Sequence, residues 1–114
     1  MAKKYYLALD LKDDPDLISQ YIQYHQRIWP EITESIRESG IDHMEIYHVQ
    51  DRLFMVIDAE DRFDFDQKAK SDQSNPIVQE WEQLMDQFQK RLPGTPDGGK
   101  WVLLSKIFDL KENG

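Results

Sequence analysis

The chain has 114 residues, contains no cysteine and carries a formal net charge of −8 at pH 7. The lack of cysteine excludes disulfides, thiol nucleophiles and cysteine-ligated metal sites, and it fits a cytoplasmic protein. The acidic balance argues against nucleic acid and anionic membranes as partners, because both are bound through concentrated basic surfaces. A neutral small molecule is therefore the easier ligand for this chain to bind.

Length and apolar content predict one folded domain over residues 1–114, with a core from about residue 3 to residue 110. Hydrophobic residues make up 39% of the chain, and its large rings comprise five Phe, five Tyr and three Trp. This content is too high for a disordered chain. No apolar run approaches the ~20 residues that span a membrane, and no cleavable signal is evident at the N-terminus.

The first two elements are predicted to be a strand and a long, interrupted helix. Residues 3–11 alternate between two faces, which is typical of a strand. Carboxylates around Pro15 then cap a helix that runs to about residue 39. Pro30 lacks an N–H, so the helix should kink or restart there, and Gly40 suits the position after its last turn.

One polar side chain interrupts the apolar stripe of this helix. Residues at steps of three and four share one helical face, and they are Ile18, Ile22, His25, Trp29, Ile32 and Ile36. Tyr21 lies one turn before His25 and is its neighbour on the helix surface. Two interpretations stay open: His25 faces a pocket beside the break, or it is a core histidine with structural partners and Pro30 opens a second short helix.

The remaining segments alternate between strands and helices. The predicted elements are strands at 42–49 and 52–59, helices at 61–71 and 76–92, a loop at 92–99 and a final strand at 101–110. The two central strands are separated by a segment of hairpin length, Gln50-Asp51. Phe63 and Phe65 are not at helical spacing, so the helix at 61–71 either turns one ring outward or begins later.

The element order is β-α-β-β-α-β, with extra helix before the last strand, and this order is typical of a ferredoxin-like α+β sandwich. In that fold the helices cover one face of an antiparallel sheet. Here the strands at 52–59 and 101–110 are apolar on both faces, so the second face also needs a cover. We therefore expect a homodimer in which two protomers pack sheet against sheet.

Acid–base chemistry is the reaction class that the residues support. His25 can donate and accept protons near neutral pH, and Tyr21 beside it can supply a hydrogen bond or relay a proton. Trp81 offers a flat apolar face for a sugar or an aromatic ligand, unless it is simply core. Glu82 lies at the edge of the same helical stripe, where its carboxylate binds hydroxyl groups or is solvated.

Other reaction classes lack a motif. His25, His43 and His48 form no H-x-x-x-H or H-E-x-x-H pattern, so the sequence predicts no metal site. No glycine-rich phosphate loop and no G-x-S-x-G elbow occurs, which leaves nucleotide cofactors and serine chemistry without support.

The run from Tyr21 to Glu31, Y-x-x-x-H-x-x-I-W-P-E, resembles the L-rhamnose mutarotase family. The order and spacing of the later strands and of Trp81 extend the resemblance over about residues 5–110. The resemblance implies a dimeric α/β-barrel assembly of ferredoxin-like protomers, no cofactor, and interconversion of the α and β anomers of a 6-deoxy sugar. It implies that His25 is the proton donor and that Tyr21 and Trp81 contact the sugar.

Two positions depart from the family pattern. Glu82 replaces the second tryptophan of a pair that lines the pocket, and Met44 replaces a tyrosine that contacts the substrate. The exchanged groups change the hydrogen bonding to the sugar, and the segments around Met44 and Glu82 resemble an L-fucose branch of the family. A competing hypothesis is a non-enzymatic protein of the same architecture that binds a small ligand or haem, with His25 as the axial ligand.

Overall fold

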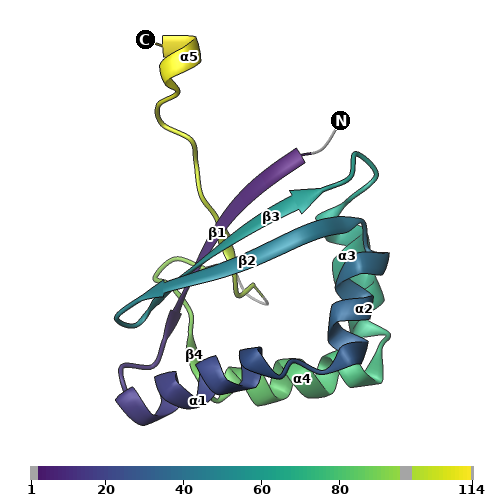
Figure 1. The fold of residues 1–114 in the computed structure, drawn as a ribbon, viewed down its shortest axis with the longest axis vertical. Coiled ribbons are helices and arrows are strands. Elements are labelled where there is room, and N and C mark those ends of the chain that lie inside the picture. The colour runs from purple at the N-terminus through teal and green to yellow at the C-terminus, as the bar shows by residue number, and fades with distance from the viewer. Residues whose placement is uncertain (1–2, 96–98, 114) are drawn as a thin grey trace.

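The computed structural model of the protein describes residues 3–95 and 99–113. Its elements are β1 (Lys3–Leu11), α1 (Pro15–Gln26), α2 (Pro30–Glu38), β2 (Ile41–Val49), β3 (Arg52–Ala59), α3 (Phe65–Gln73), α4 (Pro76–Asp86), β4 (Gln89–Lys90), β5 (Val102–Leu103) and α5 (Leu110–Asn113). Figure 1 shows the strands gathered in one sheet, α1 to α4 below and beside it, and α5 apart at the C-terminal end. Within the described ranges, no helix has both the length and the apolar character that a membrane crossing requires.

The sheet is antiparallel and its strand order is β2-β3-β1-β4, with β5 also paired to β1. β1 and β3 pair along their length, from Lys3 opposite Ala59 to Asp10 opposite Arg52. Both strands have the predicted bounds. Helices connect β1 to β2 and β3 to β4, so the predicted ferredoxin-like order is confirmed.

The predicted final strand at 101–110 is wrong for most of its length. Only Val102 and Leu103 form a strand, opposite Ala8 and Leu7 of β1. β4 pairs with Asp10 and Leu11 at the other end of the same β1 edge, so this edge is covered by two short strands. One further hydrogen bond follows, from the Leu104 amide to the Tyr6 carbonyl at 2.8 Å, and the chain then leaves the sheet.

The helix predicted to reach residue 92 ends earlier, at Asp86. Its apolar stripe continues into Phe88, which is buried just after the helix. The Phe88 carbonyl accepts a hydrogen bond from the Lys12 amide at 2.8 Å, and this bond directs the chain into β4. Phe88 continues the buried apolar stripe although it lies outside the helix. Periodicity alone therefore does not show where the helix ends. Residues 96–98 of the predicted loop lie outside the described residues.

The break between α1 and α2 occurs where Pro30 predicts it. α1 ends at Gln26, and α2 begins at Pro30 with Trp29 in an extended conformation before it, at φ −62° and ψ 133°. Proline disfavours a helical conformation in the residue before it, which explains the extended Trp29. The two helices lie at a wide angle to one another (Figure 1), and His25 occupies the last turn of α1 beside the bend.

α3 begins four residues later than predicted. The Asp64 carboxylate accepts a hydrogen bond from the Asp66 amide at 2.7 Å and caps the helix, which runs from Phe65 to Gln73. Phe63 precedes the helix and is buried. The poor helical spacing of Phe63 and Phe65 therefore reflects a late start, one of the two predicted explanations.

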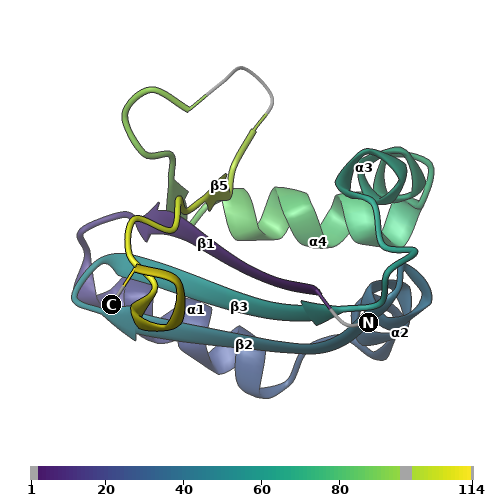
Figure 2. The ribbon, with the colours of Figure 1, turned by 90° about the horizontal axis from the view of Figure 1, so that it is seen from above.

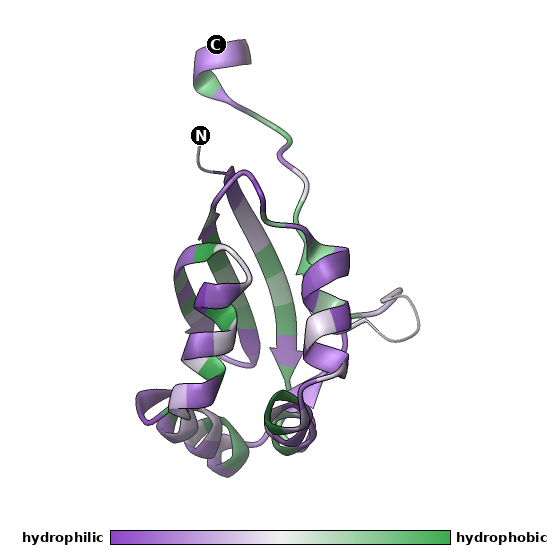
Figure 3. Ribbon diagram, turned by 90° about the vertical axis from the view of Figure 1, so that its right-hand side faces the viewer, coloured by the Kyte–Doolittle hydropathy of each residue, from purple (hydrophilic) through white to green (hydrophobic). Residues whose placement is uncertain are grey.

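The core forms on the helix-covered face of the sheet as two clusters. The first cluster consists of Leu11, Tyr21, Ile32, Leu53, Val78, Trp81, Met85 and Phe88. The second cluster consists of Leu7, Ile41, Met55, Ile57, Ala59 and Phe63. Ile36, Ile46 and Trp101 pack against both. Figure 3 shows hydrophobic bands on the strands where the helices frame them.

The opposite face of the sheet remains partly exposed. Tyr6 and Tyr47 are exposed there, and Phe54 and Val56 of β3 are half-buried. The C-terminal segment that follows β5 exposes Ile107 to 95%. The apolar character predicted for this face is therefore present within the chain, and no helix of the described residues covers it (Figure 1).

Candidate functional site

A cavity of about 550 Å³ lies on the helix side of the sheet, between the two core clusters. Figure 2 shows α1 and α2 toward the β2 side of the sheet and α3 and α4 toward the β1 side. Sheet residues that line the cavity are Leu7, Met44, Ile46, Met55 and Ile57. Polar and apolar helical side chains close it from the other side, so a sugar-sized molecule would meet apolar surface together with several polar groups.

The five residues that the sequence nominates all line this cavity. Tyr21 and His25 reach it from α1, Met44 from β2, and Trp81 and Glu82 from α4. Neither interpretation of His25 holds alone, because the ring has a structural hydrogen-bond partner and also lines the cavity. Ile22, assigned to the same stripe, does not share its surroundings and lines a different hollow.

The His25 ring is oriented by the main chain of α1. Its Nδ1 atom lies 2.9 Å from the Tyr21 carbonyl oxygen, one turn earlier. A carbonyl can only accept, so Nδ1 carries the proton in this bond and Nε2 is the nitrogen that remains for proton exchange. Burial lowers the pKa of His25 below 6.5, and the bond to the Tyr21 carbonyl offsets part of that effect. The ring is therefore neutral at pH 7.

Aromatic rings surround the imidazole. The Tyr21 ring centroid lies 4.3 Å from that of His25, and the Trp81 centroid lies 5.5 Å from it on the other helix. Trp29 in turn packs edge-on against Trp81 at 5.1 Å. These contacts fix the imidazole between two helices and leave little freedom for it to rotate.

The Tyr21 phenol is held in its protonated form. Burial raises its pKa to about 12, the negative charge of Glu82 adds to the increase, and a hydrogen bond with the Gln89 side chain opposes it. The Gln89 Oε1 atom is buried and has no hydrogen-bond partner within the part of the chain that the structure describes. Gln89 lines the cavity, so it places an unused polar atom beside Tyr21.

Lys100 and Trp101 complete the wall, and sequence reasoning missed both. The Lys100 ammonium lies 2.7 Å from the Glu82 carboxylate and 2.7 Å from that of Asp86. Trp101 lines the cavity and packs against both core clusters. Lys100 follows a Gly- and Pro-rich region that carries no periodic pattern, and the sequence prediction places Trp101 in the final strand.

The chain is similar to known proteins over nearly its whole length. A profile described as L-rhamnose mutarotase matches residues 4–110. An L-fucose mutarotase from Xanthomonas campestris pv. campestris is 42% identical over 107 residues, which is 92% of this chain and 86% of the relative. The chain belongs to the L-rhamnose mutarotase family. The resemblance read from residues 21–31 is thereby confirmed.

Solved structures share the fold of this family member. The crystal structure of an L-rhamnose mutarotase from Formosa agariphila matches with a TM-score of 0.69 at 18% identity, and covers 95% of this chain and 98% of the other. A dimeric ferredoxin-like protein from an uncultured marine organism matches with a TM-score of 0.55 at 12% identity, over 95% and 91% of the two chains. At these identities the likeness shows the fold, and it confirms the ferredoxin-like prediction.

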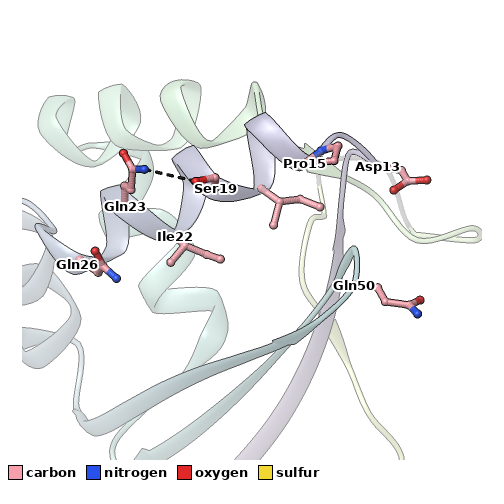
Figure 4. A pocket seen from close by; sticks show the side chains of 8 residues that line it. Asp13, Pro15, Ser19, Ile22, Gln23, Gln26 and Gln50 are labelled. Carbon is pink, nitrogen blue, oxygen red and sulfur yellow. Dashed lines mark hydrogen bonds between the residues drawn. The ribbon is translucent and has the colours of Figure 1, made fainter.

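The protein has a second hollow, which lacks the acid–base and aromatic side chains of the cavity. It measures about 590 Å³ and lies between the outer side of α1 and the Gln50 turn (Figure 4). Ile22, Gln23 and Gln26 line it, and Asp13 at its edge is its only titratable side chain. The Gln23 amide donates to the Ser19 hydroxyl at 3.4 Å. Asp13 has neither a second acid–base group nor an aromatic ring beside it among the residues that line this hollow, so the hollow lacks the paired groups that two proton transfers need.

His43 and His48 lie away from the cavity. Both are exposed on β2, and the His43 Nε2 atom is 3.7 Å from the Glu45 carboxylate. In the described ranges, no three His, Cys, Asp or Glu side chains are grouped in a way that could hold a metal ion.

Proposed function

We propose that the protein is a sugar mutarotase that interconverts the α and β anomers of a 6-deoxy-hexose, with His25 as the catalytic acid and base. The observation that carries the proposal is the neutral His25 ring at the wall of a sugar-sized cavity, with Nδ1 bonded to the Tyr21 carbonyl and Nε2 left for chemistry. Membership of the mutarotase family supports it.

The reaction needs two proton transfers. A base takes the proton from the anomeric hydroxyl, the bond between C1 and the ring oxygen breaks, and an acid gives the ring oxygen a proton. The open aldehyde turns about C1–C2, and the reverse transfers close the ring on its other face. No electron is exchanged and no covalent enzyme intermediate forms, so an acid and a base within hydrogen-bond reach suffice.

The lowered pKa of His25 indicates that the ring acts first as a base. A neutral imidazole accepts the anomeric proton during ring opening, and the imidazolium that forms returns it during closure. The resemblance names this residue a proton donor, and in our proposal it donates in the second half of each cycle. Tyr21 is protonated at neutral pH because of its raised pKa, so its phenol can give the ring oxygen its proton during opening and take that proton back during closure.

The other cavity residues suit a neutral sugar with an apolar end. Trp81 and Met44 present apolar surface, and the carboxylate of Glu82 accepts hydrogen bonds from hydroxyl groups. We propose L-fucose as the first substrate to test, because the 42% identical relative is an L-fucose mutarotase. L-rhamnose, named by the family profile, is the second.

Saturation-transfer NMR on the two anomeric protons tests the proposal. We expect the protein to accelerate anomer exchange of L-fucose, and His25→Ala to lose about 10²-fold or more of that acceleration, the range of a general acid–base group. L-rhamnose and D-galactose complete the screen. His48→Ala is the matched control, because His48 is exposed and does not line the cavity. Acceleration that survives His25→Ala would remove His25 from the mechanism.

The assembly we propose is a homodimer. Tyr47 is 54% exposed on the uncovered sheet face, and Ile107 and Phe108 are exposed in the C-terminal segment, which leads away from the sheet (Figure 1). A structural neighbour is a dimeric ferredoxin-like protein, which supports a second copy as the cover. Leaving this apolar surface in water would cost about 25 cal/mol per Å². Sedimentation equilibrium at micromolar concentration should give twice the chain mass, and a monomer would contradict the assembly.

A further inference from the structure

Lys100 makes three contacts with α4 at the wall of the cavity. Its ammonium lies 2.7 Å from Glu82 Oε2 and 2.7 Å from Asp86 Oδ1, and it donates to the Glu82 carbonyl at 3.2 Å. The side chain is only 16% exposed. Lysine side chains are mostly exposed unless they are paired, so this burial marks a built contact rather than a loose surface pair.

These contacts use the whole donor capacity of the ammonium group. A lysine ammonium has three N–H donors and no acceptor, and three acceptors surround this one. Lys100 therefore has no donor left for a sugar hydroxyl. Any influence of Lys100 on the substrate must pass through the groups that it holds.

Glu82 is the group through which Lys100 can act. Its Oε2 atom bonds to Lys100, whereas Oε1 accepts no hydrogen bond from the residues that the structure describes. The Glu82 charge also lies close enough to Tyr21 to raise the pKa of that phenol. One carboxylate oxygen is thus fixed, and the other is free to accept a hydroxyl beside Tyr21.

Without Lys100, the neighbouring carboxylates of Glu82 and Asp86 would repel one another. Glu82 and Asp86 lie four residues apart on one helix, a spacing at which like charges repel. The Glu82 side chain is 42% exposed and could turn toward water. The residues on both sides of Lys100 are anchored, because Arg91 Nε donates to the Gly99 carbonyl at 2.6 Å and Trp101 packs on the core.

We infer that Lys100 is a positioning residue that holds the Glu82 carboxylate in the cavity, where its second oxygen accepts a hydroxyl of the sugar. This inference rests on the proposed mutarotase function and deepens it. Glu82 contributes to binding the sugar in both the ground state and the transition state, so its loss raises KM more than it lowers kcat.

Exchange rates measured over a range of L-fucose concentrations test this role. Lys100→Met keeps the apolar stem and removes the charge. We expect its KM to rise on the order of tenfold, the usual effect of losing a hydrogen bond to a charged group, with kcat changed little. Lys70→Met is the matched control, because Lys70 is exposed on α3 and does not line the cavity. Lys100→Gln repeats the test if Lys100→Met does not fold.

A double-mutant cycle with Glu82→Gln separates positioning from packing. If Lys100 acts through Glu82, adding Lys100→Met to Glu82→Gln should raise KM by less than about twofold. An equal increase in both backgrounds would overturn the inference in favour of a packing role, and so would an unchanged KM in Lys100→Met alone. Both results leave an active mutarotase and the proposed function intact. A wild-type protein that exchanges no sugar anomers would instead remove the proposed function and this inference together.

Discussion

The His25 Nδ1 atom lies 2.9 Å from the Tyr21 carbonyl oxygen, one helical turn earlier. This bond fixes the neutral tautomer with the proton on Nδ1, because the carbonyl can only accept. The α1 helix ends at Gln26, one residue after His25, so the ring sits where the chain is about to bend at Pro30. A single turn of helix therefore supplies both the base and the group that orients it.

The activity should depend on pH through His25. Burial lowers its pKa below 6.5, so the ring is neutral above that pH and becomes protonated below its own pKa. Because the neutral ring accepts the first proton, the enzymatic exchange rate should be flat between pH 7 and pH 8 and should fall at lower pH. NMR exchange rates, corrected for the spontaneous reaction at each pH, give the midpoint. A rate that increases on acidification would contradict the base role.

Tyr21→Phe should distinguish the role of the Tyr21 hydroxyl from the role of its main-chain carbonyl. The substitution removes the hydroxyl but keeps the carbonyl that orients His25. We expect anomer exchange to fall by about 10- to 100-fold, since the group that gives the ring oxygen its proton is lost. Near-full activity in Tyr21→Phe would show that a water molecule supplies that proton.

The same phenol should make stability depend on alkaline pH. Its pKa is about 12 in the folded chain, above the ordinary tyrosine value of 10.0. Between these values the unfolded chain loses a proton that the folded chain keeps. The free energy of unfolding should therefore fall as pH rises above 10, by about 1.4 kcal/mol per pH unit. Urea titrations at pH 9 and pH 11 should show a smaller decrease for Tyr21→Phe than for the wild type.

The sequence contains most of the fold and the local part of the site. Alternation at 3–11 and 52–59 predicts the two central strands, and Pro30 predicts the break after α1. Tyr21 and His25 lie one turn apart on one helix, so their contact follows from helical spacing alone. These features are local, which is why periodicity and turn chemistry find them.

Contacts across loops are not predictable in this way. Lys100 reaches Glu82 over 18 residues, and no periodic pattern marks that partnership. The segment at 101–110 is apolar and β-prone, yet it forms a strand only at Val102 and Leu103 and leaves the sheet after Leu104. The point at which a chain leaves a sheet depends on tertiary contacts that residue patterns do not record.

Sugar binding should change the tryptophan fluorescence. Trp81 and Trp101 line the cavity, and Trp29 packs on Trp81 at 5.1 Å, so the three tryptophans of the chain lie at or beside the site. A titration with L-fucose should shift their emission with saturation. Trp101→Phe should reduce the amplitude of the change. Emission that stays constant while NMR shows saturation would place the sugar elsewhere.

The C-terminal segment should be needed for the proposed dimer. Ile107 is 95% exposed and Phe108 is 61% exposed within one chain, an unusual state for large apolar side chains in water. Replacing both with Asp should shift the sedimentation equilibrium toward the monomer. Lys111→Ala is the control, because it changes an exposed polar residue of the same segment. An unchanged dimer in the double Asp variant would exclude this segment from the interface.

Gly40→Ala should destabilise the fold through its backbone. Gly40 follows the last turn of α2 with φ at +104°, a conformation that residues with a Cβ atom rarely adopt. An added Cβ would meet Arg62 and Phe63 at 3.5 Å, which is ordinary contact, so strain rather than a clash sets the effect. We expect the free energy of unfolding to fall by about 1–2 kcal/mol, measured by urea denaturation.

An increase in the free energy of unfolding for Gly40→Ala would contradict this prediction. At a site with compatible φ, Gly→Ala stabilises a protein by about 0.4–1 kcal/mol, because the unfolded chain loses freedom. A gain in stability for Gly40→Ala would therefore show that the turn into β2 does not hold a positive φ. Because β2 carries Met44 into the cavity, KM for L-fucose should be measured on the same variant. We expect it to stay unchanged while stability falls, since the strain lies at the turn and not at the cavity.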